Sequence, residues 1–177
     1  MNQQKIFKVC FYGPESTGKT TMARSMAEKF NTVFVPEVAR EIIDSNDFTL
    51  DDVIRIGQAQ LQRVESLAKS ANQLLICDTD LITTRIYAQY YLGKFPEQLT
   101  ELESLEQFDA YLLFDVDVPW VADGLRDINA PEKRKAMFNL FKDALEQKNI
   151  AYHLIQGNYE ERSRLVESLL SQFIKNL

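Results

Sequence analysis

The chain has 177 residues, 45% of them hydrophobic and 11% aromatic, which predicts one globular domain, residues 1–177, with a substantial core. A net charge of −6 and a pI near 4.9 argue against a nucleic-acid partner, because a phosphate backbone is bound by clustered Lys and Arg. No apolar run approaches the roughly 20 residues that cross a bilayer, and the N-terminus lacks the apolar segment of a signal peptide, so we expect a cytoplasmic protein without a membrane partner.

Short apolar strand patterns alternate with helical patterns along the chain. The predicted strands are residues 6–12, 32–35, 74–78, 110–116 and 151–156. The clearest helix is 50–71, which Thr49 and Asp52 begin as a capping box, and the last helix has Asn158 as its N-cap with Glu161 three residues on. Because right-handed crossovers place helices on both faces of such strands, we expect an α/β fold with a five-stranded parallel sheet.

The sequence GPESTGKT, residues 13–20, follows the first predicted strand and fits the Walker A pattern G-x-x-x-x-G-K-[ST] of P-loop NTPases. Its glycines let backbone N–H groups face phosphate oxygens, Lys19 carries a positive charge to the outer phosphates, and the Thr20 hydroxyl is a Mg²⁺ ligand. The residues expected to bind the nucleotide here are Gly13, Glu15, Ser16, Thr17, Gly18, Lys19, Thr20 and Thr21.

Two aspartates follow the third predicted strand, LLICD. Asp78 ends that strand in the usual Walker B arrangement, and we expect it to reach the Mg²⁺ shell together with Thr20 because its strand lies beside the P-loop strand in nucleotide kinases. Asp80 either assists at the site or caps the helix that starts after it, and both roles remain open.

The second predicted strand runs into VPEVAR, which contains Glu37 and Arg40. A carboxylate just past a strand end is placed to accept the proton of a substrate hydroxyl or to hold a sugar, and Arg40 is placed to assist it. The alternative is an acid at a helix N-terminus with a solvated arginine.

Residues 119–137 lie where small-molecule kinases keep a mobile lid. Arg126 in VPWVADGLRD is a candidate for a contact with the γ-phosphate, whereas the basic residues 133–135 can equally be a solvated helix face. After the last strand, Asn158 and Tyr159 in QGNYEER are candidates for the adenine side of the nucleotide site, or else turn residues.

FYGPESTGKTT, FVPEVARE, ICDTDLITT and PWVADGLRD, in this order over nearly the whole chain, resemble the motifs of the ribosylnicotinamide kinase domain of the NadR-type NAD-biosynthesis proteins. The resemblance implies ATP-dependent phosphorylation of the 5′-hydroxyl of nicotinamide riboside, which gives nicotinamide mononucleotide for NAD salvage. ATP and Mg²⁺ are then the cofactors and a riboside is the small-molecule partner. The implied catalytic residues are Lys19, Glu37, Asp78 and Arg126. The implied substrate residues are Glu37, Arg40, Asp80, Trp120 and Asp123. The Trp120 indole either stacks on the cationic pyridinium ring or packs the hinge of the lid.

Other functions remain to be separated from this one. Another nucleoside or small-molecule kinase has the same P-loop and acid, and an ATP-binding regulatory ATPase is the second alternative. A GTPase switch is disfavoured because D-x-x-G and N-K-x-D are absent, and an AAA-type ATPase is disfavoured because it needs a second helical domain. The repressor and adenylyltransferase domains of full-length NadR-type proteins are not expected within this length, and the sequence carries no indication of oligomeric state.

Overall fold

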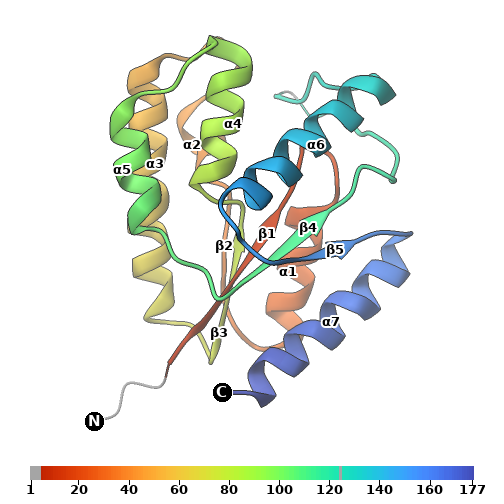
Figure 1. Ribbon diagram of the computed structural model, residues 1–177. Helices are drawn as coiled ribbons and strands as arrows, with labels where there is room; N and C mark the ends of the chain where they lie inside the picture. The colour runs from red at the N-terminus through yellow and green to blue at the C-terminus, as the bar shows by residue number, and fades with distance from the viewer. Residues whose placement is uncertain (1–4, 124) are drawn as a thin grey trace.

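The computed structural model describes residues 5–123 and 125–177 and contains one five-stranded parallel sheet with helices on both faces (Figure 1). The strand order is β2-β3-β1-β4-β5, and every pairing is parallel. The strands are β1 (Phe7–Tyr12), β2 (Phe34–Val35), β3 (Leu74–Asp78), β4 (Ala110–Phe114) and β5 (Tyr152–Ile155). The predicted α/β fold is confirmed, with each predicted strand present, though shortened to the residues that make ladder hydrogen bonds.

Helices fill the connections between the strands. They are α1 (Lys19–Lys29), α2 (Ala39–Ile42), α3 (Leu50–Ala68), α4 (Leu81–Leu92), α5 (Glu97–Leu105), α6 (Pro131–Gln147) and α7 (Tyr159–Lys175). The two predicted caps are confirmed, since Thr49 begins α3 and Asn158 begins α7, each in a reciprocal capping box. None of the helices in the described residues is long and apolar enough to cross a membrane.

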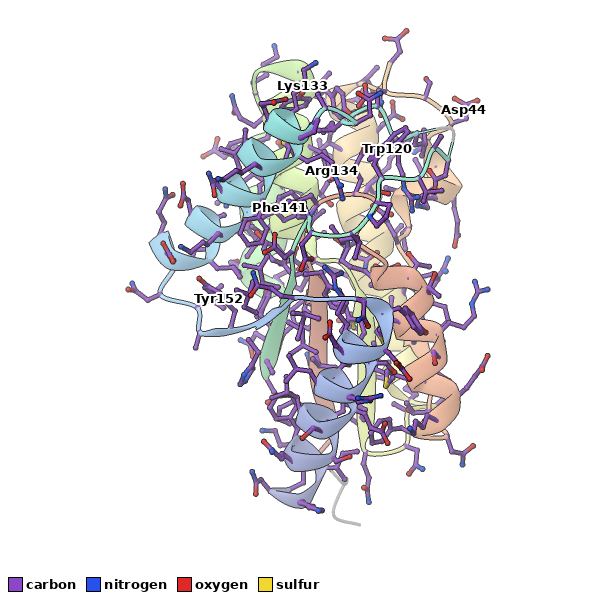
Figure 2. All side chains as sticks on the ribbon, turned by 90° about the vertical axis from the view of Figure 1, so that its right-hand side faces the viewer. Asp44, Trp120, Lys133, Arg134, Phe141 and Tyr152 are labelled. Atoms are coloured by element: carbon purple, nitrogen blue, oxygen red, sulfur yellow. The ribbon has the colours of Figure 1, made fainter. Side chains whose placement is uncertain are left out.

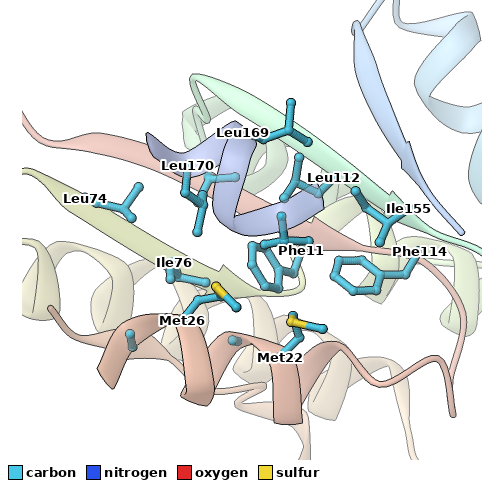
Figure 3. Close-up of a cluster of buried hydrophobic side chains, with 14 residues drawn as sticks. Phe11, Met22, Met26, Leu74, Ile76, Leu112, Phe114, Ile155, Leu169 and Leu170 are labelled. Atoms are coloured by element: carbon cyan, nitrogen blue, oxygen red, sulfur yellow. The ribbon is translucent and has the colours of Figure 1, made fainter. Parts of the chain in front are cut away.

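The side chains of β1 point alternately to the two faces of the sheet, and each face has its own apolar core layer. Val9 and Phe11 face the cluster that α1 and α7 cover, which Figure 3 shows with Met22 and Met26 of α1 beneath the sheet. Cys10 and Tyr12 point to the opposite face, where they pack with residues of α4 and α6. Because both faces of the central strands β1, β3 and β4 are covered, most of their residues are apolar and buried, whereas the edge strand β5 exposes His153 and Leu154.

The sheet order sets the place of the site. β1 lies between β3 and β4, so the chain leaves β1 at the point where neighbouring connections run in opposite directions, and the carboxyl ends of the strands open a crevice there. Phe11 of β1 is in register with Asp78 of β3. The P-loop, which starts at Gly13, therefore begins next to the last residue of β3.

Candidate active site

The P-loop joins β1 to α1 and depends on its two glycines. Gly13 has φ 136°, and a Cβ there would come within 2.7 Å of the carbonyl oxygen of Phe114. Gly18 has φ 84° and directly precedes the first residue of α1. Neither position accepts another residue without strain, so the backbone is held in a turn whose N–H groups, with the N-terminus of α1, form an anion site.

Lys19 folds back over this loop. Its Nζ donates hydrogen bonds to the carbonyl oxygen of Pro14 at 2.6 Å and to Oγ1 of Thr17 at 3.4 Å. Burial lowers the pKa of Lys19, and the negative charges of Asp78 and Glu37 act in the opposite direction. The ammonium group therefore lies against the loop that forms the phosphate cradle.

Thr20 and Asp78 meet at the metal side of the cradle. The Thr20 hydroxyl donates to Oδ2 of Asp78 at 2.5 Å, and Asp78 is 1% exposed. Burial, opposed by Lys19, raises the pKa of Asp78 to about 6. In the described residues no three His, Cys, Asp or Glu side chains form a metal-binding group, so a cation here would have one carboxylate, one hydroxyl, water and phosphate. Mg²⁺ is commonly held by such oxygen ligands, and the residues fit it.

Asp80, for which the sequence left a role at the site and a helix cap open, is not among the described residues that line the cleft. It is fully buried as the N-cap of α4, where Oδ1 accepts hydrogen bonds from the backbone N–H and the hydroxyl of Thr83, both at 2.9 Å. Its Oδ2 accepts a hydrogen bond from the Tyr111 hydroxyl at 3.2 Å. Both oxygens are used inside the fold, so of the two roles left open by the sequence, the structure supports the cap.

The structure brings Glu37, Arg40, Asp123 and Arg126 together in one cluster of charges. Arg40 donates from Nε to Glu37 at 2.8 Å and from Nη1 to Asp123 at 2.8 Å. Arg126 forms an ion pair with the same oxygen of Asp123 at 3.2 Å. The chain of charges connects the end of β2 with the loop after β4, and Glu37, Arg40 and Arg126 line the cleft between them.

Trp120 makes a contact within the protein that agrees with packing at the lid hinge, one of its two expected roles. Its indole N–H donates to Oε1 of Glu15 at 3.2 Å, and the backbone N–H of Ile128 donates to the same oxygen at 2.9 Å. Val121 N–H donates to the Ser16 hydroxyl at 2.7 Å. Trp120 is not among the described residues that line the cleft, and Figure 2 shows it in the loop after β4. Glu15 and Ser16 thus hold this loop, residues 118–128, against the P-loop through their side chains.

This geometry predicts the result of removing the indole N–H. Trp120→Phe keeps an aromatic ring but loses the hydrogen bond to Glu15, so we expect the Michaelis constants for both ATP and the second substrate to rise together by about 2- to 10-fold, the equivalent of one hydrogen bond. Steady-state kinetics with each substrate varied in turn, alongside Trp120→Leu, measures the effect. A Michaelis constant that rises for the second substrate only, in Trp120→Leu but not in Trp120→Phe, would instead support stacking.

The turn between β5 and α7 lies next to the P-loop through a residue that sequence reasoning missed. Arg162 is 2% exposed and donates from Nη1 to the carbonyl oxygen of Thr17 at 2.7 Å and from Nε to that of Gly157 at 2.8 Å. Asn158 uses its Oδ1 to cap α7, and Tyr159 is half-exposed. Neither is among the described residues that line the cleft, so their nucleotide contacts remain predictions. Arg162 lies four residues before Val166 on the buried face of α7, and this helical spacing is the signal in the sequence that could have revealed its buried position.

The cleft continues beyond the P-loop into an apolar end. It holds about 1100 Å³ of empty space, a figure that includes open solvent at its mouth. The side chains at this end come from the segment after β2 and from α3 and α4: Ile43, Phe48, Val53, Ile56, Tyr87 and Tyr91. The sequence analysis named none of them as site residues, because they are apolar or aromatic and resemble core positions.

A family model described as an AAA domain matches residues 8–162, from β1 into α7. The chain belongs to the AAA domain family. The match covers the P-loop, Asp78 and the whole sheet, although the sequence analysis disfavoured an AAA-type ATPase. Membership in the AAA domain family identifies a nucleotide-binding fold and leaves the reaction to be argued from the cleft.

Two curated relatives of this AAA domain are the trifunctional NAD biosynthesis/regulator proteins NadR of Salmonella typhimurium and Escherichia coli K12. Each is 31% identical over 161 residues, which is 87% of this chain and 39% of the relative. The chain thus spans well under half the length of these relatives. The resemblance to NadR-type proteins that the sequence motifs indicate is confirmed.

Solved structures agree with the fold. A NadR protein in complex with NR superposes with a TM-score of 0.79 at 26% identity, over 96% of this chain and 52% of that one. A deoxyadenosine kinase from M. mycoides superposes with a TM-score of 0.69 at 13% identity, over 94% of this chain and 100% of that one. The second likeness shows the fold alone, which is that of a P-loop kinase.

Proposed function

We propose that this chain transfers the γ-phosphoryl group of ATP to the 5′-hydroxyl of nicotinamide riboside, and that residues 1–177 form a single kinase domain with a lid at 119–137. One observation carries the proposal: a single cleft joins a P-loop cradle to an apolar, aromatic-lined end, with the Glu37 carboxylate on its wall. The name NadR of the curated relatives, and a solved NadR structure that contains NR, support nicotinamide riboside as the substrate. Gly124, inside the lid, lies outside the described residues.

The residues divide the chemistry among them. In the transfer, the bond between the γ-phosphorus and the ADP oxygen breaks, a bond from the 5′-oxygen to phosphorus forms, and the hydroxyl proton passes to Glu37. Glu37 lines the same cleft as Lys19 and Asp78, which places its carboxylate on the wall of the phosphate end. Lys19 and Arg126 neutralise the charge on the transferred group, and Arg40 orients Glu37 through their 2.8 Å hydrogen bond.

Thr20 and Asp78 would hold Mg²⁺, which when bound neutralises the phosphate oxygens. The side chains of Glu15 and Ser16 hold the lid loop, while the P-loop backbone and Thr17, Thr21, Asn158 and Tyr159 remain our candidates for contacts with ATP. The reaction requires ATP, and for this reason we keep the cytoplasm as the proposed location. Asp123 acts on the site through Arg40 and Arg126.

The raised pKa of Asp78 predicts how the metal requirement depends on pH. Below about pH 6 the carboxyl is protonated, and a proton must leave before the cation binds. The apparent affinity for Mg²⁺ should therefore rise about 10-fold per unit as the pH increases toward 6, and level off above 7. Magnesium titrations of activity at fixed ATP measure this. Because ATP itself also titrates, Asp78→Asn is the control, and an identical pH dependence in both proteins would contradict the assignment.

A panel of acceptors tests the proposed function. The protein is incubated with Mg-ATP and nicotinamide riboside, adenosine, cytidine, thymidine or no acceptor, and phosphorylated products are separated by mass. We expect nicotinamide mononucleotide to form fastest. Faster phosphorylation of an ordinary nucleoside would favour the alternative kinase, and ADP formation without any phosphorylated acceptor would favour a regulatory ATPase.

A further inference from the structure

A glutamine lies in the buried face of α3, on the wall of the cleft. Val53, Ile56, Gly57 and Val64 are the other buried residues of that face, and Gln60 is 2% exposed among them. The sequence analysis did not name Gln60, because hydrophobic patterning passes over a polar residue at a buried helical position. A buried amide without hydrogen bonds is unfavourable, so both ends of this side chain need partners.

One end of the amide has its partner inside the protein. The backbone N–H of Val38, just after β2, donates to Oε1 of Gln60 at 3.3 Å. Because a backbone N–H only donates, the oxygen must face Val38, and this fixes the amide against the opposite orientation. The amino group Nε2 is therefore on the side of the amide that faces away from Val38.

The amino group of Gln60 has no hydrogen-bond partner among residues 5–123 and 125–177. Gln60 lines the same cleft as the apolar side chains of Ile43, Phe48, Val53 and Ile56. A donor held in such surroundings favours a ligand that brings an acceptor oxygen to it, and disfavours one that leaves it unpaired.

We propose that Gln60 determines substrate specificity by donating a hydrogen bond from Nε2 to the carbonyl oxygen of the carboxamide on the pyridinium ring. The inference rests on the proposed function, and it adds which atom of the substrate is read and by which residue. Gln60 selects among rings: those with an acceptor oxygen at this position bind, and those without one are disfavoured.

The test compares two acceptors in two proteins. Nicotinamide riboside and the riboside of unsubstituted pyridine differ only in the carboxamide, and Gln60→Glu keeps an oxygen for the Val38 N–H while replacing the donor with an acceptor. In the wild type we expect kcat/KM to favour nicotinamide riboside by about 10- to 100-fold, the usual range for one desolvated hydrogen bond. In Gln60→Glu the ratio of the two kcat/KM values should fall to about 1 or below, because KM for nicotinamide riboside rises. KM for ATP should stay unchanged.

Controls separate recognition from folding. Gln58→Glu makes the same change on an exposed position of α3, so it should keep the wild-type preference. Gln60→Met fills a similar volume without charge and should also lose the preference, which covers the case in which the buried Glu prevents folding. Melting temperatures are measured for all variants.

The outcomes distinguish this inference from the proposed function. If the wild type phosphorylates nicotinamide riboside, but Gln60→Glu and Gln60→Met lose equal factors on both ribosides, Gln60 supports the fold only and the inference is overturned. A wild type without preference between the ribosides overturns it as well. If the wild type phosphorylates neither riboside, the proposed function itself is wrong and the inference falls with it.

Discussion

Lys19→Ala should reduce phosphoryl transfer by on the order of 10³-fold or more, about 4 kcal/mol of transition-state stabilisation, while the protein stays folded. The reason is the position of Nζ, which folds over the P-loop at 2.6 Å from the carbonyl oxygen of Pro14 and brings a positive charge to the phosphate cradle. Its removal leaves the sheet and its two apolar layers intact. Steady-state kcat/KM with ATP and the riboside, together with a melting temperature, gives the measurement.

Lys29 provides the matched control for that variant. It ends the same helix and pairs at the surface with Glu167, so Lys29→Ala removes an equal charge from α1 far from the cradle. We expect wild-type activity from it. Equal turnover by Lys19→Ala and the wild type would remove the P-loop kinase assignment.

Asp78→Asn should lower turnover on the order of 10²-fold or more and raise the Mg²⁺ concentration needed for half-maximal rate. The amide keeps the shape of the carboxylate but loses the charge that the cation requires. Burial raises the pKa of Asp78, so keeping this carboxyl ionised at neutral pH lowers the free energy of unfolding of the metal-free protein. An uncharged amide at this position removes that cost. The variant without metal should be at least as stable as the wild type at pH 7.5.

Asp80→Asn separates the two neighbouring acids. Its carboxylate accepts hydrogen bonds from Thr83 and Tyr111 inside the fold, so the substitution should lower the melting temperature and leave the magnesium titration unchanged. An unaltered magnesium requirement in Asp78→Asn, with an altered one in Asp80→Asn, would reverse the two assignments.

The phosphate side of the site was predictable because its determinants are local or follow from sheet geometry. Gly13, Gly18, Lys19 and Thr20 lie within eight residues, and their spacing alone fixes a turn before a helix. Asp78 was predictable because the carboxyl ends of adjacent parallel strands meet at one edge, and Phe11 in β1 is its register partner.

The substrate side was not predictable to the same extent, because side-chain partners there come from distant segments. Trp120 looked like a stacking residue until Glu15, 105 positions earlier, proved to accept its N–H. Asp80 had two plausible roles that differ only in where its oxygens point. Gln60 and Arg162 are polar residues at helical spacing within apolar stripes, and hydrophobic patterning alone passes over such positions.

The central claim is that the cleft passes a phosphoryl group from ATP to a riboside hydroxyl. Its most direct test mixes the protein with Mg-ATP carrying a labelled γ-phosphate, with and without nicotinamide riboside, and follows both ADP and labelled nicotinamide mononucleotide over time. The account predicts that the two products appear in equal amounts with the riboside and that ADP formation is slow without it. ADP released at the same rate in both reactions, with no label on the riboside, would contradict the claim.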